Sequence, residues 1–250
     1  MRNIEKALQE HKQVVLDAGF AEDQILGIFL YGSQNYGLAT ENSDVDTKAI
    51  LIPTLEDLCS KKAGFVKEYK LDNNEKVVVM DLIHYFDNLK KQNINYVETL
   101  FTDYKWVNPN HEWIWGTLQT MRESIAYYDV NKAVLSMGHQ ALHTLRQDSA
   151  DPKKYAMARY ISHFLKVYAV EKEDRVPYKE ALRPLYAVEE FLAIKIGNQT
   201  YTGLDVACLK RHLERVINRK PLEEEVAQKE YVDKYLMKLL VAAIRNLDNL

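Results

Sequence analysis

The first part of the chain alternates short apolar runs with polar turns. Apolar residues at helical spacing predict a helix over residues 4–18, which Gly19 ends. Runs rich in β-branched and aromatic residues predict strands over residues 25–31, 45–52 and 77–83. The strand at 77–83 is expected to pair with the segment before it, across the turn "DNNE", as a hairpin. Further helices are predicted over residues 54–59, 83–92 and 94–101.

After Pro109 the pattern becomes helical. Apolar residues keep helical spacing over residues 134–145, 157–168 and 232–244, and we expect no strand there. The predicted fold class is therefore α+β. A mixed sheet with flanking helices would occupy residues 1–107, and a helical bundle would occupy residues 108–250.

Composition is that of an ordinary soluble protein. The chain has 250 residues, 47% of them hydrophobic, with a formal net charge of -3, so a general attraction to nucleic acid is not expected. The two cysteines, Cys59 and Cys208, are far apart and form no metal-binding or disulfide pattern. The N-terminus is charged, and no apolar run is long enough to span a membrane. We expect a cytoplasmic protein with no membrane partner.

The segment "FLYGSQNYGLATENSDVDTKAIL", residues 29–51, carries the main chemical signal. Alternate residues of a strand share a face, so Asp44, Asp46 and Lys48 should point the same way. Adjacent carboxylates repel each other, a cost that is tolerated where divalent cations bind them, and Mg²⁺ prefers oxygen ligands. Gly32 and Ser33, at the preceding turn, could let backbone N–H groups and a hydroxyl approach a phosphate.

A third carboxylate would complete a site for two metal ions. Asp81 ends the apolar run "KVVVMD" on the face of Val77 and Val79, and we predict that it is this third ligand and helps to take a proton from the attacking hydroxyl. The alternative is that Asp81 is the first residue of the following helix, where the helix dipole favours a negative charge.

These stretches resemble a known family. The Gly-Ser pair followed by Asp-x-Asp resembles the signature of the DNA polymerase β-like nucleotidyltransferase superfamily. "YGSQNYGLATENSDVDTKAIL", "DLIHYFDNLKKQNINYVETLF", "KKYAMARYISHFLKVY" and "FLAIKIGN" are similar to the predicted nucleotidyltransferases of its RNA-repair-associated branch. The resemblance covers about residues 25–197. Gln34 and Ala49 depart from it, since members often carry a basic residue or histidine and a glycine there.

The resemblance implies a polymerase β-like palm and two Mg²⁺ ions, with Mn²⁺ as an alternative. By motif, Gly32 and Ser33 form the phosphate turn, Asp44 and Asp46 are the paired ligands, and Asp81 is the third. The implied reaction transfers a nucleoside monophosphate from a nucleoside triphosphate such as ATP to a hydroxyl. The family neighbourhood suggests an RNA end, as in RNA repair.

Three cationic residues are weaker candidates for nucleotide binding. Lys48 shares the face of the aspartates, but could equally pair with Asp46. Lys154 and Arg159 lie in the family-like helix and could bind the triphosphate, although solvated surface charge explains many such residues.

The sequence is also compatible with other functions. The acceptor could be a small molecule or a protein side chain instead of RNA. A non-enzymatic reading is an antitoxin-like binding module that keeps the fold and transfers nothing. The three carboxylates argue against that module, because a degenerate copy does not need costly adjacent charges. The sequence does not fix the base preference or the oligomeric state.

Overall fold

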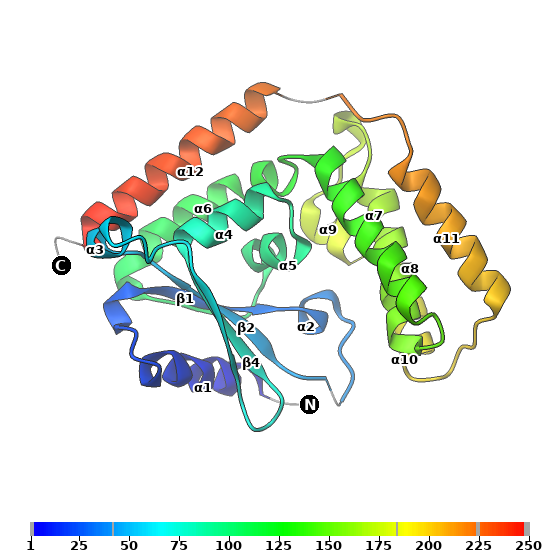
Figure 1. The fold of residues 1–250 in the computed structure, drawn as a ribbon, viewed down its shortest axis with the longest axis horizontal. Coiled ribbons are helices and arrows are strands. Elements are labelled where there is room, and N and C mark those ends of the chain that lie inside the picture. Colours follow the sequence, from blue (N-terminus) through cyan, green and yellow to red (C-terminus); the bar gives the residue numbers. More distant parts are fainter. Residues whose placement is uncertain (1–2, 42, 184, 224–225, 248–250) are drawn as a thin grey trace.

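A mixed sheet forms the centre of the N-terminal part of the chain. The computed structural model describes residues 3–41, 43–183, 185–223 and 226–247 (Figure 1). The described residues form one five-stranded sheet in the order β3-β4-β2-β1-β5. Strand β1 is antiparallel to β2 and β5, β2 is parallel to β4, and β3 is antiparallel to β4. The strands are β1 Ile25–Tyr31, β2 Asp46–Leu51, β3 Val66–Lys70, β4 Lys76–Asp81 and β5 Lys105–Val107.

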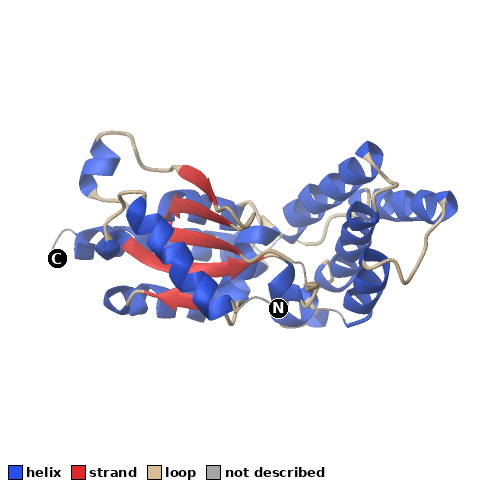
Figure 2. Cartoon of the chain, turned by 90° about the horizontal axis from the view of Figure 1, so that it is seen from below, coloured by secondary structure: helices blue, strands red, loops and turns tan. Residues whose placement is uncertain are grey.

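Helices cover both faces of this sheet (Figures 1 and 2). Helix α1 packs on one face, where Ile28, Ala49 and Val79 belong to the same buried cluster as Leu8 of the helix. Helices α4 and α6 cover the other face, and there Phe29 of β1 stacks on Trp115 of α6 with ring centroids 4.2 Å apart. The helices of this part are α1 Ile4–Asp17, α2 Ser33–Tyr36, α3 Leu55–Cys59, α4 Leu82–Lys90 and α5 Ile94–Val97, followed by the 3₁₀ turn η2 Glu98–Phe101.

The rest of the described chain is helical. Helices α7, α8, α10 and α11 pack side by side, and α12 returns to lie against α6 and α4 (Figure 1). These helices are α6 Glu112–Ala126, α7 Val130–Gln147, α8 Pro152–Tyr168, α9 Tyr178–Leu182, α10 Leu185–Lys195, α11 Gly203–Ile217 and α12 Val226–Leu247. The predicted α+β class, with a sheet in the N-terminal part and helices after it, is confirmed. In the described residues, no helix is long and apolar enough to cross a membrane.

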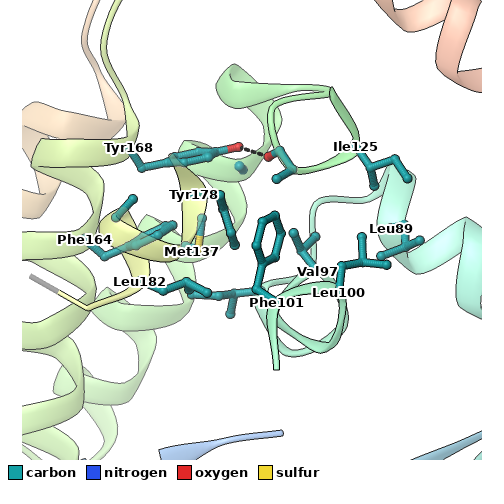
Figure 3. Packing of buried hydrophobic residues seen from close by; sticks show 14 of the residues in the cluster. Leu89, Val97, Leu100, Phe101, Ile125, Met137, Phe164, Tyr168, Tyr178 and Leu182 are labelled. Carbon is teal, nitrogen blue, oxygen red and sulfur yellow. Dashed lines mark hydrogen bonds between the residues drawn. The ribbon is translucent and has the colours of Figure 1, made fainter. Parts of the chain in front are cut away.

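One hydrophobic core runs from the sheet into the helical part. Its buried residues include Phe29 of β1, Phe101 of η2 and Phe164 of α8. Figure 3 shows Phe101 beside Tyr178, with ring centroids 4.9 Å apart, while Val97 and Leu100 lie on the side of Leu89. The Tyr168 hydroxyl lies 2.9 Å from the Ala126 carbonyl and 3.0 Å from Oε1 of Gln92, and the contact with Gln92 links α8 to the part that carries the sheet. The helices after residue 107 therefore pack directly against the part that carries the sheet.

Candidate functional site

The Gly-Ser pair forms a tight turn at the end of β1. Gly32 has φ 89° and ψ -152°, a combination that is essentially restricted to glycine, and α2 begins at Ser33. Strand β1 ends at Tyr31, Gly32 is the N-cap, and the four residues Ser33–Tyr36 form α2. The sequence predicted the turn here, but not the short helix.

The two aspartates lie next to this turn. Asp46 is the first residue of β2 and pairs with Tyr31, the last residue of β1, so the Gly-Ser pair and the Asp-x-Asp motif meet at one edge of the sheet. Asp44 is exposed just before β2, whereas Asp46 is half-buried. We call the edge formed by Gly32, Ser33, Asp44 and Asp46 the aspartate edge.

Asp46 is held by its neighbour on β4. Its Oδ1 atom accepts a hydrogen bond from the backbone N–H of Lys76 at 3.2 Å. Burial raises the pKa of the Asp46 carboxyl, and Asp44 adds to this rise, while Lys76 and Lys48 oppose it. Two carboxylates that disfavour each other's charge attract a divalent cation, which would remove the repulsion.

Asp81 does not join these two aspartates, and that prediction is wrong. Strands β2 and β4 are parallel, and Asp81 pairs with Leu51 at the opposite end from Asp46. Five steps along a strand, at about 3.3 Å each, separate the two ends by roughly 16 Å. In the described residues, no group of three or more His, Cys, Asp or Glu side chains is arranged to hold a metal ion.

Asp81 instead caps a helix. It is fully buried, and its carboxylate accepts hydrogen bonds from the N–H groups of His84 at 2.9 Å and Gly64 at 2.5 Å. Asp81 also alternates with Val77 and Val79, which face α1, whereas Asp46 alternates with Ile50, which faces the other side of the sheet. The alternative role at the helix N-terminus is therefore the one that the structure shows.

Lys48 was predicted to bind a nucleotide phosphate, but its side chain is buried and is not accessible to one. Its Nζ atom lies 3.0 Å from the centre of the Tyr31 ring and 4.9 Å from that of Tyr96. Burial lowers the pKa of Lys48 to about 7, while the charges of Glu98 and Asp46 oppose that fall. Lys48 therefore acts as a counter-charge between two carboxylates.

Glu98 is a residue of this site that the sequence reasoning missed. It is fully buried, and both carboxylate oxygens lie 3.1 Å from the Gly32 N atom, which donates to them. The Asn35 side chain donates to Oε2 at 3.2 Å, and Asn35 in turn accepts from Thr102 at 2.7 Å. Burial raises the pKa of Glu98 to about 7, against the attraction of Lys48. The available signal was a charged residue inside the apolar stretch "NYVETLF".

Lys154 and Arg159 are paired within the helical part. The Lys154 ammonium lies 3.5 Å from Asp148, and both side chains are partly exposed. Arg159 donates from Nε to Glu190 at 2.9 Å. Neither contact involves the aspartate edge, so the predicted role of these two residues in nucleotide binding gains no support from the geometry.

Two other cations of the helical part contact the loop between the motifs. Lys195 of α10 donates to the Leu38 carbonyl at 3.2 Å and to Ser43 Oγ at 3.3 Å. Arg183 donates from Nε to the Asn35 carbonyl. Burial lowers the pKa of Lys195, and the Asp44 charge opposes that fall. Lys195 lies in "FLAIKIGN", a stretch that carried part of the family resemblance.

Comparisons with known proteins identify no family for this chain. No family model matches the chain, and no curated protein matches it. The aspartate edge itself brings two carboxylate residues, Asp44 and Asp46, next to the turn formed by Gly32 and Ser33. Mg²⁺ is commonly held by one or two carboxylates together with substrate phosphates, so this set suits a metal-bound phosphate.

Proposed function

We propose that the protein is a nucleotidyltransferase and that the aspartate edge binds the Mg²⁺-bound triphosphate of its nucleotide. One observation carries the proposal: the pairing of Tyr31 with Asp46 brings the Gly-Ser turn and the Asp-x-Asp motif together. These segments are 11 to 14 residues apart in the sequence, and only the antiparallel pairing of β1 and β2 makes them neighbours.

Each part of the edge has a separate role in this proposal. Asp44 and Asp46 hold Mg²⁺, which neutralises charge on the triphosphate. Ser33 contacts a phosphate from the turn, where Gly32 places no side chain. An acceptor hydroxyl would attack the α-phosphorus in line. A new O–P bond forms, the bond to pyrophosphate breaks, and the proton of the hydroxyl passes to solvent. An RNA end is the acceptor that the sequence resemblance favours. Positioning and charge stabilisation would supply most of the catalysis.

A second candidate function is a nucleotide-binding module that transfers nothing. The position of Asp81 favours it, because the third carboxylate expected of a two-metal site lies at the other end of β4. The residues of β4 that share the face of Asp46 near the aspartate edge are Lys76 and Val78, and neither carries a carboxylate. Two aspartates suffice for a nucleotide-bound Mg²⁺, so binding is compatible with both functions.

Labelled nucleotides test the proposal. The wild-type protein, Mg²⁺ and each α-³²P-labelled triphosphate are incubated with cellular RNA, a metabolite extract or protein extract. We expect label in the RNA fraction, and loss of that label in Asp46→Asn. Asp72→Asn is the matched control, because Asp72 is an exposed carboxylate on the β3–β4 turn, and it should transfer label like the wild type.

Thermal unfolding of the same proteins separates the two candidate functions. A ligand that binds only the native state stabilises it by about 2.7 kcal/mol at a hundred times Kd. Stabilisation by Mg²⁺ with a nucleoside triphosphate, but no labelled product, would support the binding module. No stabilisation and no labelled product would contradict both functions.

A further inference from the structure

Glu98 is a charged residue in a place where charge is costly. Its side chain is fully buried beneath the aspartate edge, in the 3₁₀ turn η2. Removing a carboxylate from water is unfavourable unless hydrogen bonds and opposite charge compensate for the loss of hydration. The groups that compensate Glu98 therefore indicate what the residue does.

Those groups belong to the Gly-Ser turn. The N–H of Gly32 donates to the carboxylate of Glu98, and the Asn35 side chain donates to Oε2 of the same carboxylate. Because Gly32 N–H is directed into the protein, it is not available to a ligand. Ser33 follows directly and is the first residue of α2.

Lys48 connects Glu98 to the strand of aspartates. Lys48 lies two residues after Asp46 on the same face of β2, and both Glu98 and Asp46 attract its charge. The ring of Tyr31, the last residue of β1, lies under the Lys48 ammonium. Glu98 and Lys48 thus contact or face both the Gly-Ser turn and Asp46, the two parts of the aspartate edge.

We propose that Glu98 is a positioning residue, which fixes the Gly32 peptide so that Ser33 is presented to a nucleotide phosphate. The inference rests on the proposed function, because it assumes that the aspartate edge binds a triphosphate. Glu98 is buried and does not touch the ligand. It acts through Gly32 and Asn35.

The test measures nucleotide affinity in Glu98→Gln. The amide keeps the shape of the side chain but removes the charge. Because the Gly32 N–H contacts both carboxylate oxygens, either orientation of the amide turns its N–H donor toward Gly32. The nucleotide used is the one among ATP, GTP, CTP and UTP, each with Mg²⁺, that most stabilises the wild-type protein. We expect Kd to rise about tenfold, which corresponds to a loss of about 1.4 kcal/mol of binding free energy, because the Gly32 peptide is no longer fixed in the conformation that presents Ser33.

Glu75→Gln is the matched control for the loss of a buried carboxylate. Glu75 is also buried, and its carboxylate lies 3.2 Å from Nε2 of His11 of α1, on the opposite face of the sheet. We expect this variant to lose stability and to keep the wild-type Kd. Hydrogen exchange gives a second readout, because the Gly32 amide should exchange faster in Glu98→Gln than in Glu75→Gln.

Each outcome decides the inference. A wild-type Kd in folded Glu98→Gln would overturn it while leaving the proposed function in place. A wild-type protein that binds none of the four nucleotides would overturn both. If Glu98→Gln does not fold, Glu98→Asp keeps the charge near Lys48 but shortens the side chain by one methylene. An unchanged Kd in Glu98→Asp would then overturn the role of the Gly32 hydrogen bond.

Discussion

At the scale of single residues, burial decides which charged groups a ligand can reach. Asp44, just before β2, is exposed and Asp46 is half-buried, whereas Lys48, two residues further along β2, is 2% exposed. Alternation along β2 gives all three the same face, but only the depth of each position shows that the lysine is enclosed by aromatic rings. A ligand at the aspartate edge would therefore meet the two carboxylates and not the ammonium.

Gly32 gives a prediction at this scale. A Cβ atom at Gly32 would meet nothing within 4 Å, so space is available, but φ 89° with ψ -152° strains any other residue. Gly32→Ala should lower the free energy of unfolding by about 1–3 kcal/mol, measured by urea denaturation. It should also weaken Mg²⁺-nucleotide binding. Relief of the strain at residue 32 would move its N–H group, which donates a hydrogen bond to Glu98.

The control for this substitution is a glycine that has space for a Cβ atom and an unstrained backbone conformation. Gly116 lies inside α6, a Cβ atom there would also meet nothing within 4 Å, and its φ is not in the left-handed region. Gly116→Ala should raise the free energy of unfolding by up to about 1 kcal/mol, because alanine favours helix more than glycine does. Equal effects of the two substitutions would contradict the argument from strain.

At the scale of elements, the apolar pattern predicted the long elements well. The strand expected over residues 25–31 is β1 with the same limits, and the expected hairpin is the β3–β4 pair. The strand expected over 77–83 ends earlier, at Asp81, because α4 begins at Leu82. The short elements α2 and β5 were not predicted, and in the helical part the expected ranges correspond to α7, α8 and α12 and leave out α6, α9, α10 and α11. β5 has three residues, too few to show a period, and it exists because it pairs with β1.

The relation between strands was harder to predict than the strands themselves. Alternation correctly gave Asp81 the face of Val77 and Val79, but it does not say which end of β4 lies beside Asp46. That depends on the parallel direction of β2 and β4, which local pattern does not contain. The aspartate edge was easier, because two antiparallel strands that follow each other in the chain place the end of the first beside the start of the second.

Asp81 gives a prediction at the scale of elements. Asp81→Ala removes the N-cap of α4 and the hydrogen bond from Gly64. The free energy of unfolding should fall by about 1–2 kcal/mol, as for other N-cap losses, and Kd for Mg²⁺-nucleotide should stay at the wild-type value. Thr54→Ala, which removes the N-cap of α3, is the control. A large rise in Kd in Asp81→Ala alone would place Asp81 in the binding site after all.

At the scale of the whole molecule, the sheet and the helices after it are joined in several ways. Tyr36 of α2 contacts Tyr160 of α8, with ring centroids 5.5 Å apart, beside the cations that reach the loop between the motifs. Helix α12 returns to α4 and α6 from the far end of the chain (Figure 1). The aspartate edge therefore depends on contacts from the helical part, although all of its residues precede residue 47.

This continuity predicts that the protein unfolds in one cooperative transition. The three tryptophans, Trp106, Trp113 and Trp115, lie in β5 and α6, so their fluorescence reports on the region of the sheet. Circular dichroism at 222 nm is dominated by helices, most of which follow residue 107. Because one buried cluster contains Phe29, Phe101 and Phe164, neither region can lose its packing without exposing the other. The two signals should have the same urea midpoint, and midpoints that differ beyond error would show that the parts unfold independently.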